Sequence, residues 1–371
     1  MKKQTLYVGV SQFDTPPLHT SVYALDAQSG ATQWSNTLVQ AGNDISYQFL
    51  QVVNGVAYVA YATHTSSTSY TDTVDALSTK DGRLLWRYQV DDQYEGIHTM
   101  IVCNGIVYLG ITRFGPGAVA GTTSIVVALQ ASDAKLLWCY SSADSSYYDQ
   151  LEVTDTMLYL ITAKNLDAQN YTVLSTMHAL YANNGEEVWQ KTYTTYALGV
   201  VATATNSVIY AIVPSHTSIQ KYDGSEIHAL QASDGTLVWH AKASLGSAIT
   251  RKAVTNDLLY LDANDRLCAF SLTDGTLRWC SDGAHDATLL NGGDFIYTTN
   301  AQQVCALQPT DGKKRWCVSY PNIGSTILAS DSAVYVASNF AGTLYALRKS
   351  DGSKLWYRQI DNAIFGLAFE E

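Results

Sequence analysis

Two pairs of cysteines have a spacing that could support thiol chemistry. Cys268 and Cys280 lie twelve positions apart, and so do Cys305 and Cys317. If each pair faces across two neighbouring antiparallel strands, its sulfur atoms are within disulfide range. The alternative is that all four are small buried hydrophobic residues that were duplicated with their repeat. Cys139 favours this alternative, because it has the same place in the repeat and faces a valine.

Histidines and carboxylates could bind a metal ion. His19, His64 and His216 fall in three polar segments without the local spacing typical of a zinc site, which favours solvated loop residues. His178 and His228 are expected to be structural. Acidic residues gather in one class of loop: Asp91, Asp92, Glu95, Asp144, Asp149, Asp282, Asp286 and Asp361. Carboxylates suit Ca²⁺, so these form either a cation site or, more simply, a solvated acidic rim.

Signatures of catalysis are missing from the chain. It contains no Gly-x-Ser-x-Gly, His-Glu-x-x-His or Gly-x-x-x-x-Gly-Lys motif. Hydrolases can work without such motifs, so whether the chain is an enzyme is left open, with a non-enzymatic function favoured. We name no catalytic, cofactor-binding or metal-binding residue.

A repeat determines which elements position these residues. A 13-residue phrase, such as IHALQASDGTLVW at 227–239, occurs eight times, always with alanine third and tryptophan last. All eight tryptophans of the chain belong to it. The docking pairs, as we call these residues, are Ala24 and Trp34, Ala76 and Trp86, Ala128 and Trp138, Ala179 and Trp189, Ala229 and Trp239, Ala269 and Trp279, Ala306 and Trp316, and Ala346 and Trp356.

Each phrase is typical of a β-hairpin, because a polar turn, with Asp-Gly or Asn-Gly in six of the eight copies, separates two short apolar runs. A three-residue loop would place each alanine opposite its tryptophan. A tyrosine-centred strand precedes every phrase, and a further apolar strand precedes most of these. The pattern predicts an all-β fold: a closed eight-bladed β-propeller with four antiparallel strands per blade, in one domain spanning 1–371. The segment at 363–369 is expected to complete the first blade.

The phrase ALDAQSGATQW at 24–34 resembles the tryptophan-docking motif of the pyrroloquinoline-quinone (PQQ)-like β-propellers, and the resemblance covers all eight copies. It implies that each indole is wedged between neighbouring blades. That family includes quinoprotein dehydrogenases, which bind PQQ with Ca²⁺, and a non-enzymatic outer-membrane assembly lipoprotein of Gram-negative bacteria. The enzymes commonly stack the quinone on a tryptophan, and some use adjacent cysteines. This chain has no spare tryptophan and no adjacent cysteines, so no cofactor is predicted, with PQQ and Ca²⁺ as the alternative.

A long-loop face is the predicted binding surface. The tyrosine and the docking alanine are separated by 17–20 residues in blades 1–5 and by 9–11 in blades 6–8. The long segments are rich in Thr, Ser and Tyr, which suits a protein, peptide or glycan partner. The alternative is that they are longer ends of the two strands. We therefore predict a binding or scaffolding propeller, with a PQQ- and Ca²⁺-binding dehydrogenase as the alternative.

Composition excludes two classes of partner. The net charge of −11 and the lack of basic stripes argue against nucleic-acid binding. No apolar run approaches the length of a membrane span. We expect a monomer. The start MKKQTLYVGV has no apolar signal region, so the chain as it stands would be cytoplasmic, and a trimmed domain or mature form would be extracytoplasmic.

Overall fold

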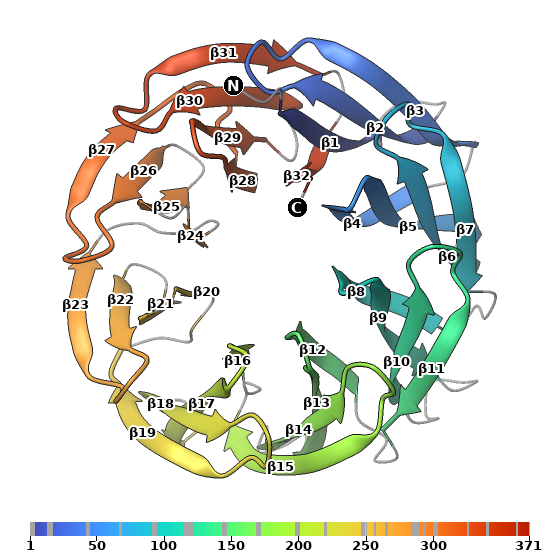
Figure 1. Cartoon of the computed structure of the whole chain (residues 1–371). Helices are drawn as coiled ribbons and strands as arrows, with labels where there is room; N and C mark the ends of the chain where they lie inside the picture. The colour runs from blue at the N-terminus through green and yellow to red at the C-terminus, as the bar shows by residue number, and fades with distance from the viewer. Residues whose placement is uncertain are drawn as a thin grey trace. The chain divides into compact units, whose positions relative to one another are not determined.

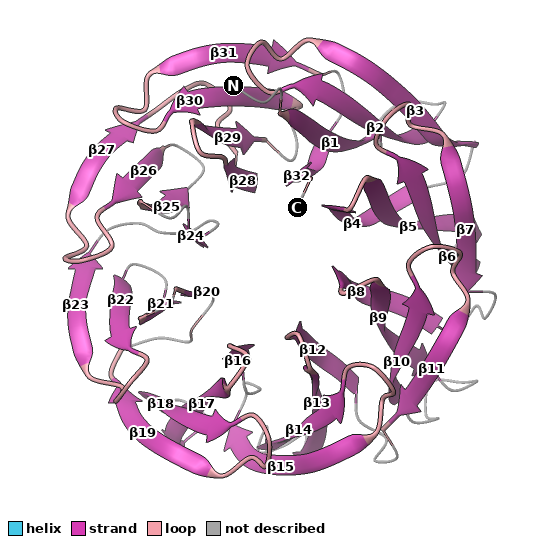
Figure 2. Cartoon of the chain, in the orientation of Figure 1, coloured by secondary structure: helices cyan, strands magenta, loops and turns pink. Residues whose placement is uncertain are grey.

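The computed structural model consists of strands and connecting loops, and its described elements include no helix (Figure 2). The described residues are 4–12, 18–41, 45–66, 69–90, 95–114, 122–142, 147–167, 172–196, 201–218, 221–245, 249, 251–255, 257–263, 266–282, 289–291, 294–299, 303–324, 326–338, 341–360 and 363–370. They form eight four-stranded antiparallel sheets, which are the blades of an eight-bladed β-propeller. The predicted fold class is confirmed.

The chain divides into two compact units, and each is described by itself. Unit 1 combines residues 1–93 with 285–371 and holds blades 1, 2, 7 and 8. Its strands are β1 (Thr5–Gln12), β2 (Leu18–Asp26), β3 (Thr32–Ala41) and β32 (Ala363–Phe369) in blade 1; β4 (Ile45–Val53), β5 (Val56–Ser66), β6 (Ser69–Ser78) and β7 (Leu84–Val90) in blade 2; β24 (Leu289–Asn291), β25 (Ile296–Thr299), β26 (Val304–Leu307) and β27 (Lys314–Val318) in blade 7; and β28 (Thr326–Ala329), β29 (Ala333–Ala337), β30 (Thr343–Arg348) and β31 (Lys354–Gln359) in blade 8.

Unit 2 comprises residues 94–284 and holds blades 3–6. Its strands are β8 (Glu95–Cys103), β9 (Ile106–Phe114), β10 (Thr122–Gln130) and β11 (Leu136–Ser141) in blade 3; β12 (Tyr147–Val153), β13 (Met157–Asp167), β14 (Thr172–Tyr181) and β15 (Glu187–Tyr196) in blade 4; β16 (Val201–Ala204), β17 (Val208–Ser218), β18 (Lys221–Gln231) and β19 (Leu237–Ala243) in blade 5; and β20 (Arg251–Val254), β21 (Leu258–Ala263), β22 (Arg266–Ser271) and β23 (Leu277–Asp282) in blade 6. The prediction of one domain over the whole chain stays a prediction.

The C-terminal strand β32 completes the first blade, as the sequence predicts. It pairs antiparallel with β1, from Leu6 opposite Phe369 to Ser11 opposite Ala363. In Figure 1 the red strand β32 lies beside the dark-blue strand β1. The ring of Phe365 covers Gly9 so closely that a Cβ built on this glycine would lie 1.8 Å from the ring. A residue without a side chain is therefore required at this point of β1.

The repeated phrase forms the hairpin between the third and fourth strands of each blade. Its alanine lies opposite its tryptophan in all eight copies, as in Ala24 opposite Trp34. The loop differs from the prediction, because Leu25 already pairs with Thr32 and a β-bulge separates this pair from the docking pair. The loop is one residue longer than predicted, and the bulge restores the register.

The last loop residue adopts a left-handed backbone conformation, which glycine accepts without steric cost. In seven copies this residue is a glycine, such as Gly82 with φ of 71°. In the third copy Ala134 takes the same conformation, with φ of 60°. The turn therefore keeps its type and Ala134 bears the strain.

The hydrophobic core lies between successive blades of each unit. One cluster joins blades 4 and 5 through Tyr159, Ile209 and Leu230, and Trp189 packs against it. Another joins blades 5 and 6 through Tyr210, Leu259 and Phe270, and Trp239 packs against that one. Burial of apolar surface thus holds one blade against the next, in addition to the hydrogen bonds within each blade.

Candidate functional site

The docking alanine lies between a tyrosine and a tryptophan on its two neighbouring strands. In blade 5, Tyr210 faces Ala229 on one side and Trp239 faces it on the other. The two large rings meet over the small residue, with centroids 5.8 Å apart. The same contact occurs in every blade, with centroids 5.8–6.0 Å apart. A larger residue than alanine would separate the rings.

The indole then contacts the hairpin turn of the next blade. Trp239 Nε1 donates to the backbone oxygen of Leu272 at 3.0 Å, and Trp34 Nε1 donates to that of Thr79 at 2.8 Å. Trp189, Trp316 and Trp356 make the equivalent bonds to Ala232, Lys349 and Ala27. The same indoles lie over the turn glycine, and a Cβ built on Gly82 would lie 2.6 Å from Trp34.

The contact between blades 3 and 4 differs from this pattern. Trp138 Nε1 is buried and has no hydrogen-bond partner among the described residues. The equivalent acceptor is the backbone oxygen of Ala182. It instead accepts a hydrogen bond from the hydroxyl of Tyr108 at 2.9 Å. Burial raises the pKa of Tyr108 to about 12, so this hydroxyl is protonated and can donate at neutral pH.

The cysteine pairs lie directly beside docking pairs. Cys268 is opposite Cys280 and Cys305 is opposite Cys317, each with Cα atoms 4.1 Å apart, and the structure joins both pairs as disulfides. Cys139 is exposed, belongs to neither disulfide and faces Val127 in the same register. Cys103 likewise belongs to neither disulfide.

We call this position the flanking pair: the residue before the docking alanine and the residue after the docking tryptophan. The flanking pairs of blades 1–8 are Tyr23 and Ser35, Asp75 and Arg87, Val127 and Cys139, His178 and Gln190, His228 and His240, Cys268 and Cys280, Cys305 and Cys317, and Tyr345 and Tyr357. Five of these pairs are chemically matched. Residues twelve apart around each phrase were the sequence signal, which we used only for the cysteines.

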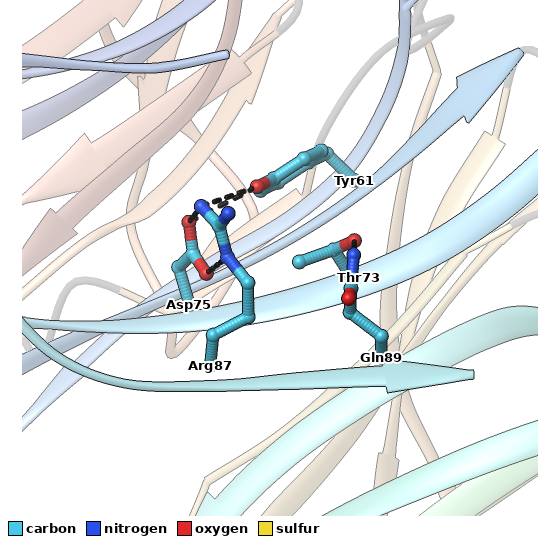
Figure 3. A network of polar contacts seen from close by, with 5 residues as sticks. All are labelled: Tyr61, Thr73, Asp75, Arg87 and Gln89. Atoms are coloured by element: carbon cyan, nitrogen blue, oxygen red, sulfur yellow. Dashed lines mark hydrogen bonds and ion pairs between the residues drawn. The ribbon is translucent and has the colours of Figure 1, made fainter. Parts of the chain in front are cut away.

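The flanking pair of blade 2 forms a buried polar network (Figure 3). Arg87 Nε and Nη2 each donate to the fully buried carboxylate of Asp75 at 2.7 Å. Tyr61 Oη donates to Asp75 Oδ2 at 3.0 Å and accepts from Arg87 Nη2 at 3.2 Å. Burial and the negative charge of Asp75 raise the pKa of Tyr61, so its hydroxyl remains a donor. Both oxygens of the Asp75 carboxylate and the Tyr61 hydroxyl are hydrogen-bonded within the network, which indicates a structural function.

The described residues of the predicted long loops are largely strand. The middle two strands of each blade, which are β1 and β2 in blade 1, differ in length around the chain. They have 8–11 residues in blades 1–5 and 4–6 residues in blades 6–8. The alternative of longer strand ends is therefore what the structure shows. In blade 2 the pairing extends to Ser66 opposite Ser69, which leaves only positions 67–68 between the strands. We call these five extended pairs the projecting hairpins.

The structure describes the side chain of only one of the predicted metal-binding loop residues, His19. The side chains of His64 and His216, and those of the eight acids of the predicted rim, lie outside the described residues. His19 is placed, at the start of β2 opposite Gln12. Among the residues that the structure describes, no group of three or more His, Cys, Asp or Glu side chains is arranged to hold a metal ion.

The quinone that the family resemblance implies would need an aromatic face to stack on. Each of the eight indoles already packs on a tyrosine of its own blade. No described helix could cross a membrane.

Comparison with protein families now identifies the chain. The family described as outer membrane protein assembly factor BamB matches residues 18–113, 115–241, 174–319 and 223–366. The chain belongs to this family. The resemblance to PQQ-like propellers, inferred from the tryptophan phrase, is thereby confirmed. None of the curated proteins matches this BamB-family chain in sequence.

Solved structures share the fold of this BamB-family chain at low sequence identity. BamB from Moraxella catarrhalis is 16% identical, with a TM-score of 0.54 over 86% of this chain and 90% of that one. AztD from Citrobacter koseri is 10% identical, with a TM-score of 0.58 over 99% and 98%. The dihydro-heme d1 dehydrogenase NirN in complex with DHE is 12% identical, with a TM-score of 0.64 over 98% and 74%. These identities show the fold alone.

Proposed function

We propose that the chain is a non-enzymatic scaffolding propeller that binds a protein partner through the projecting hairpins of blades 1–5. The observation that carries this proposal is the contrast in strand length between blades 1–5 and blades 6–8. Short hairpins suffice for the docking contacts, as blades 6–8 demonstrate. The additional length in the other five blades is therefore available for recognition.

The projecting hairpins are built as rigid extensions. Ser11 Oγ and Thr20 Oγ1, both buried, are hydrogen-bonded at 3.0 Å across β1 and β2. Ser21 Oγ donates to Thr37 Oγ1 at 3.1 Å across β2 and β3. Satisfied hydroxyls of this kind order the base of a hairpin, and a preorganised surface loses less entropy when it binds.

Bulges reshape the projecting hairpins and expose an apolar side chain. Register shifts occur toward the tips in blades 2, 4 and 5, whereas the equivalent strand pairs of blades 6–8 have none. In blade 4 the shift lies between Asn165 and Asp167, and Leu166 is 52% exposed. A half-exposed leucine at a bulge suits a protein surface better than a glycan. The family description, an assembly factor, agrees with a protein partner.

The test compares two exposed leucines in capture experiments from the cells that produce the protein. Leu166→Asp should abolish capture of a partner that the wild-type chain retains. Leu355→Asp is the matched control, because Leu355 is 45% exposed on β31 of blade 8, which has no projecting hairpin. The partner lost with Leu166→Asp is then purified and titrated against all three proteins. Equal affinity for the wild type and Leu166→Asp would contradict the proposal.

A second titration separates the scaffold from the dehydrogenase alternative. PQQ and CaCl₂ are added to the wild-type chain while the visible absorption and the melting temperature are followed. The proposal predicts no saturable change in either. Saturable binding of both would contradict it.

A further inference from the structure

His228 and His240 form the matched flanking pair of blade 5. In the four other matched pairs the two partners are visibly linked: by an ion pair in blade 2, by disulfides in blades 6 and 7, and by ring packing at 4.9 Å in blade 8. The imidazoles of His228 and His240 stand edge to face with centroids 6.2 Å apart. Two neutral imidazoles are joined most strongly by a shared metal ion.

His228 is held as metal-binding histidines are held. Its Nε2 lies 3.2 Å from Glu226 Oε2, and because a carboxylate can only accept, Nε2 carries the proton. The lone pair is then on Nδ1, which makes no hydrogen bond with any described residue. A carboxylate that accepts from one ring nitrogen while the other binds metal is the usual arrangement around zinc-bound histidine. The ring of Tyr193 packs against His228 at 5.6 Å and fixes its orientation.

His240 provides the second ligand from the neighbouring strand. It lies opposite His228, on β19, and its side chain is exposed. Residues directly opposite in an antiparallel pair point to the same face, so both imidazoles project together. Zn–N bonds are about 2.0–2.1 Å long, and two adjacent rings can reach one ion with small side-chain rotations.

We propose that His228 and His240 chelate a divalent transition-metal ion of the Zn²⁺ class, with Glu226 supporting His228. Among the described residues no group of three or more His, Cys, Asp or Glu side chains is arranged to hold a metal ion. The proposed site therefore has two histidine ligands, and water fills the other coordination positions of the ion. Imidazole nitrogens suit Zn²⁺, Cu²⁺ and Ni²⁺ and disfavour Ca²⁺ and Mg²⁺. Lys242 lies opposite Glu226 in the next cross-strand pair on the same face of the sheet, and its positive charge opposes binding of a cation.

The equivalent position in blade 4 lacks this capacity. His178 precedes the docking alanine there, but Gln190 lies opposite it. His178 Nδ1 is engaged by Glu187 at 3.0 Å and by Tyr140 Oη at 3.1 Å, and its Nε2 is buried. The site is therefore specific to blade 5.

The experiment is calorimetric titration of the untagged full chain with ZnCl₂, without reductant or chelator. We expect saturable one-to-one binding by the wild type. His240→Gln should lower the affinity at least about 10-fold, because loss of a mere supporting residue already costs about 10–100-fold at metal sites. Lys242→Gln should raise it by about 2- to 5-fold, because one opposing charge is removed.

The variants are chosen so that the fold is kept and every outcome is decisive. His240 and Lys242 are exposed, and their substitutions remove no buried contact. Unchanged affinity in His240→Gln would mean adventitious binding elsewhere and would overturn the proposal. The same holds if the wild type shows no saturable binding, or if Lys242→Gln weakens it.

Discussion

Tyr210 and Trp239 meet across Ala229 and direct their polar atoms to the same backbone oxygen. Trp239 Nε1 donates to Leu272 O at 3.0 Å and Tyr210 Oη donates to it at 3.5 Å. Tyr335 and Trp356 converge on Ala27 O in the same way. An aromatic pair from one blade thus holds the hairpin turn of the next, and alanine is the spacer that allows it.

Replacing Ala134 by glycine should stabilise the protein. Its φ of 60° costs an ordinary residue about 1–2 kcal/mol, whereas glycine adopts it freely. We expect Ala134→Gly to raise the free energy of unfolding by about 0.5–1 kcal/mol in urea denaturation. Gly82→Ala is the reciprocal change and should destabilise, because the added Cβ also meets Trp34. A destabilised Ala134→Gly would disprove the shared turn conformation.

A count of thiols tests the cysteine pairing. With both disulfides formed, the denatured wild-type chain should expose two thiols, Cys103 and Cys139, to Ellman's reagent without reductant. Val127→Cys creates a third cysteine pair, with Cys139, so the count should fall to one and stability should rise by about 2–3 kcal/mol. Six thiols in the wild type would refute the disulfides, and three in the variant would refute the shared register.

Formation of both disulfides would also indicate where the protein resides. Disulfides persist in oxidising compartments and are rare in the cytosol. A count of two thiols in protein isolated from its own cells under alkylating conditions would therefore favour an extracytoplasmic location.

Neutralising Asp75 should destabilise the protein far more than neutralising a surface carboxylate. Asp75→Asn leaves Arg87 without its buried anion, and we expect a loss of about 1–3 kcal/mol in the free energy of unfolding, limited by the 39% exposure of the Arg87 side chain. Asp351→Asn is the control, because Asp351 pairs with Arg348 on the surface and should change stability much less than Asp75→Asn does. Equal effects of the two changes would argue against the network.

The buried tyrosines predict alkaline instability. Burial raises the pKa of Tyr108 and of Tyr193 from the ordinary value of 10.0 to about 12. Their folded-state pKa exceeds the unfolded value, so their stabilisation is complete below pH 10 and is lost as pH rises from 10 to 12. The strand signal in circular dichroism should then be lost over this pH range. Tyr108→Phe should flatten this loss, and a loss identical to that of the wild type would contradict the contribution of Tyr108.

The sequence predicts the blades well, because the fixed distance between alanine and tryptophan determines which residues face each other. It could not distinguish a three-residue loop from a longer loop with a bulge, since both place Ala24 opposite Trp34. The fixed spacing also could not decide whether the paired cysteines form disulfides or are small buried hydrophobic residues, because both fit the same position of the repeat. The sequence left the choice between long loops and longer strand ends open, because Ser and Thr serve equally in loops and in buried strand ends such as Ser11 with Thr20.

The central claim is that the tryptophans hold successive blades together, and Trp239→Ala tests it most directly. Loss of this indole removes its contact with Tyr210 and its bond to Leu272. Urea denaturation should show a loss of about 3–5 kcal/mol and a less cooperative transition, whereas Val238→Ala, an exposed neighbour, should change stability by less than about 0.5 kcal/mol. A loss below about 1 kcal/mol in Trp239→Ala would contradict the account.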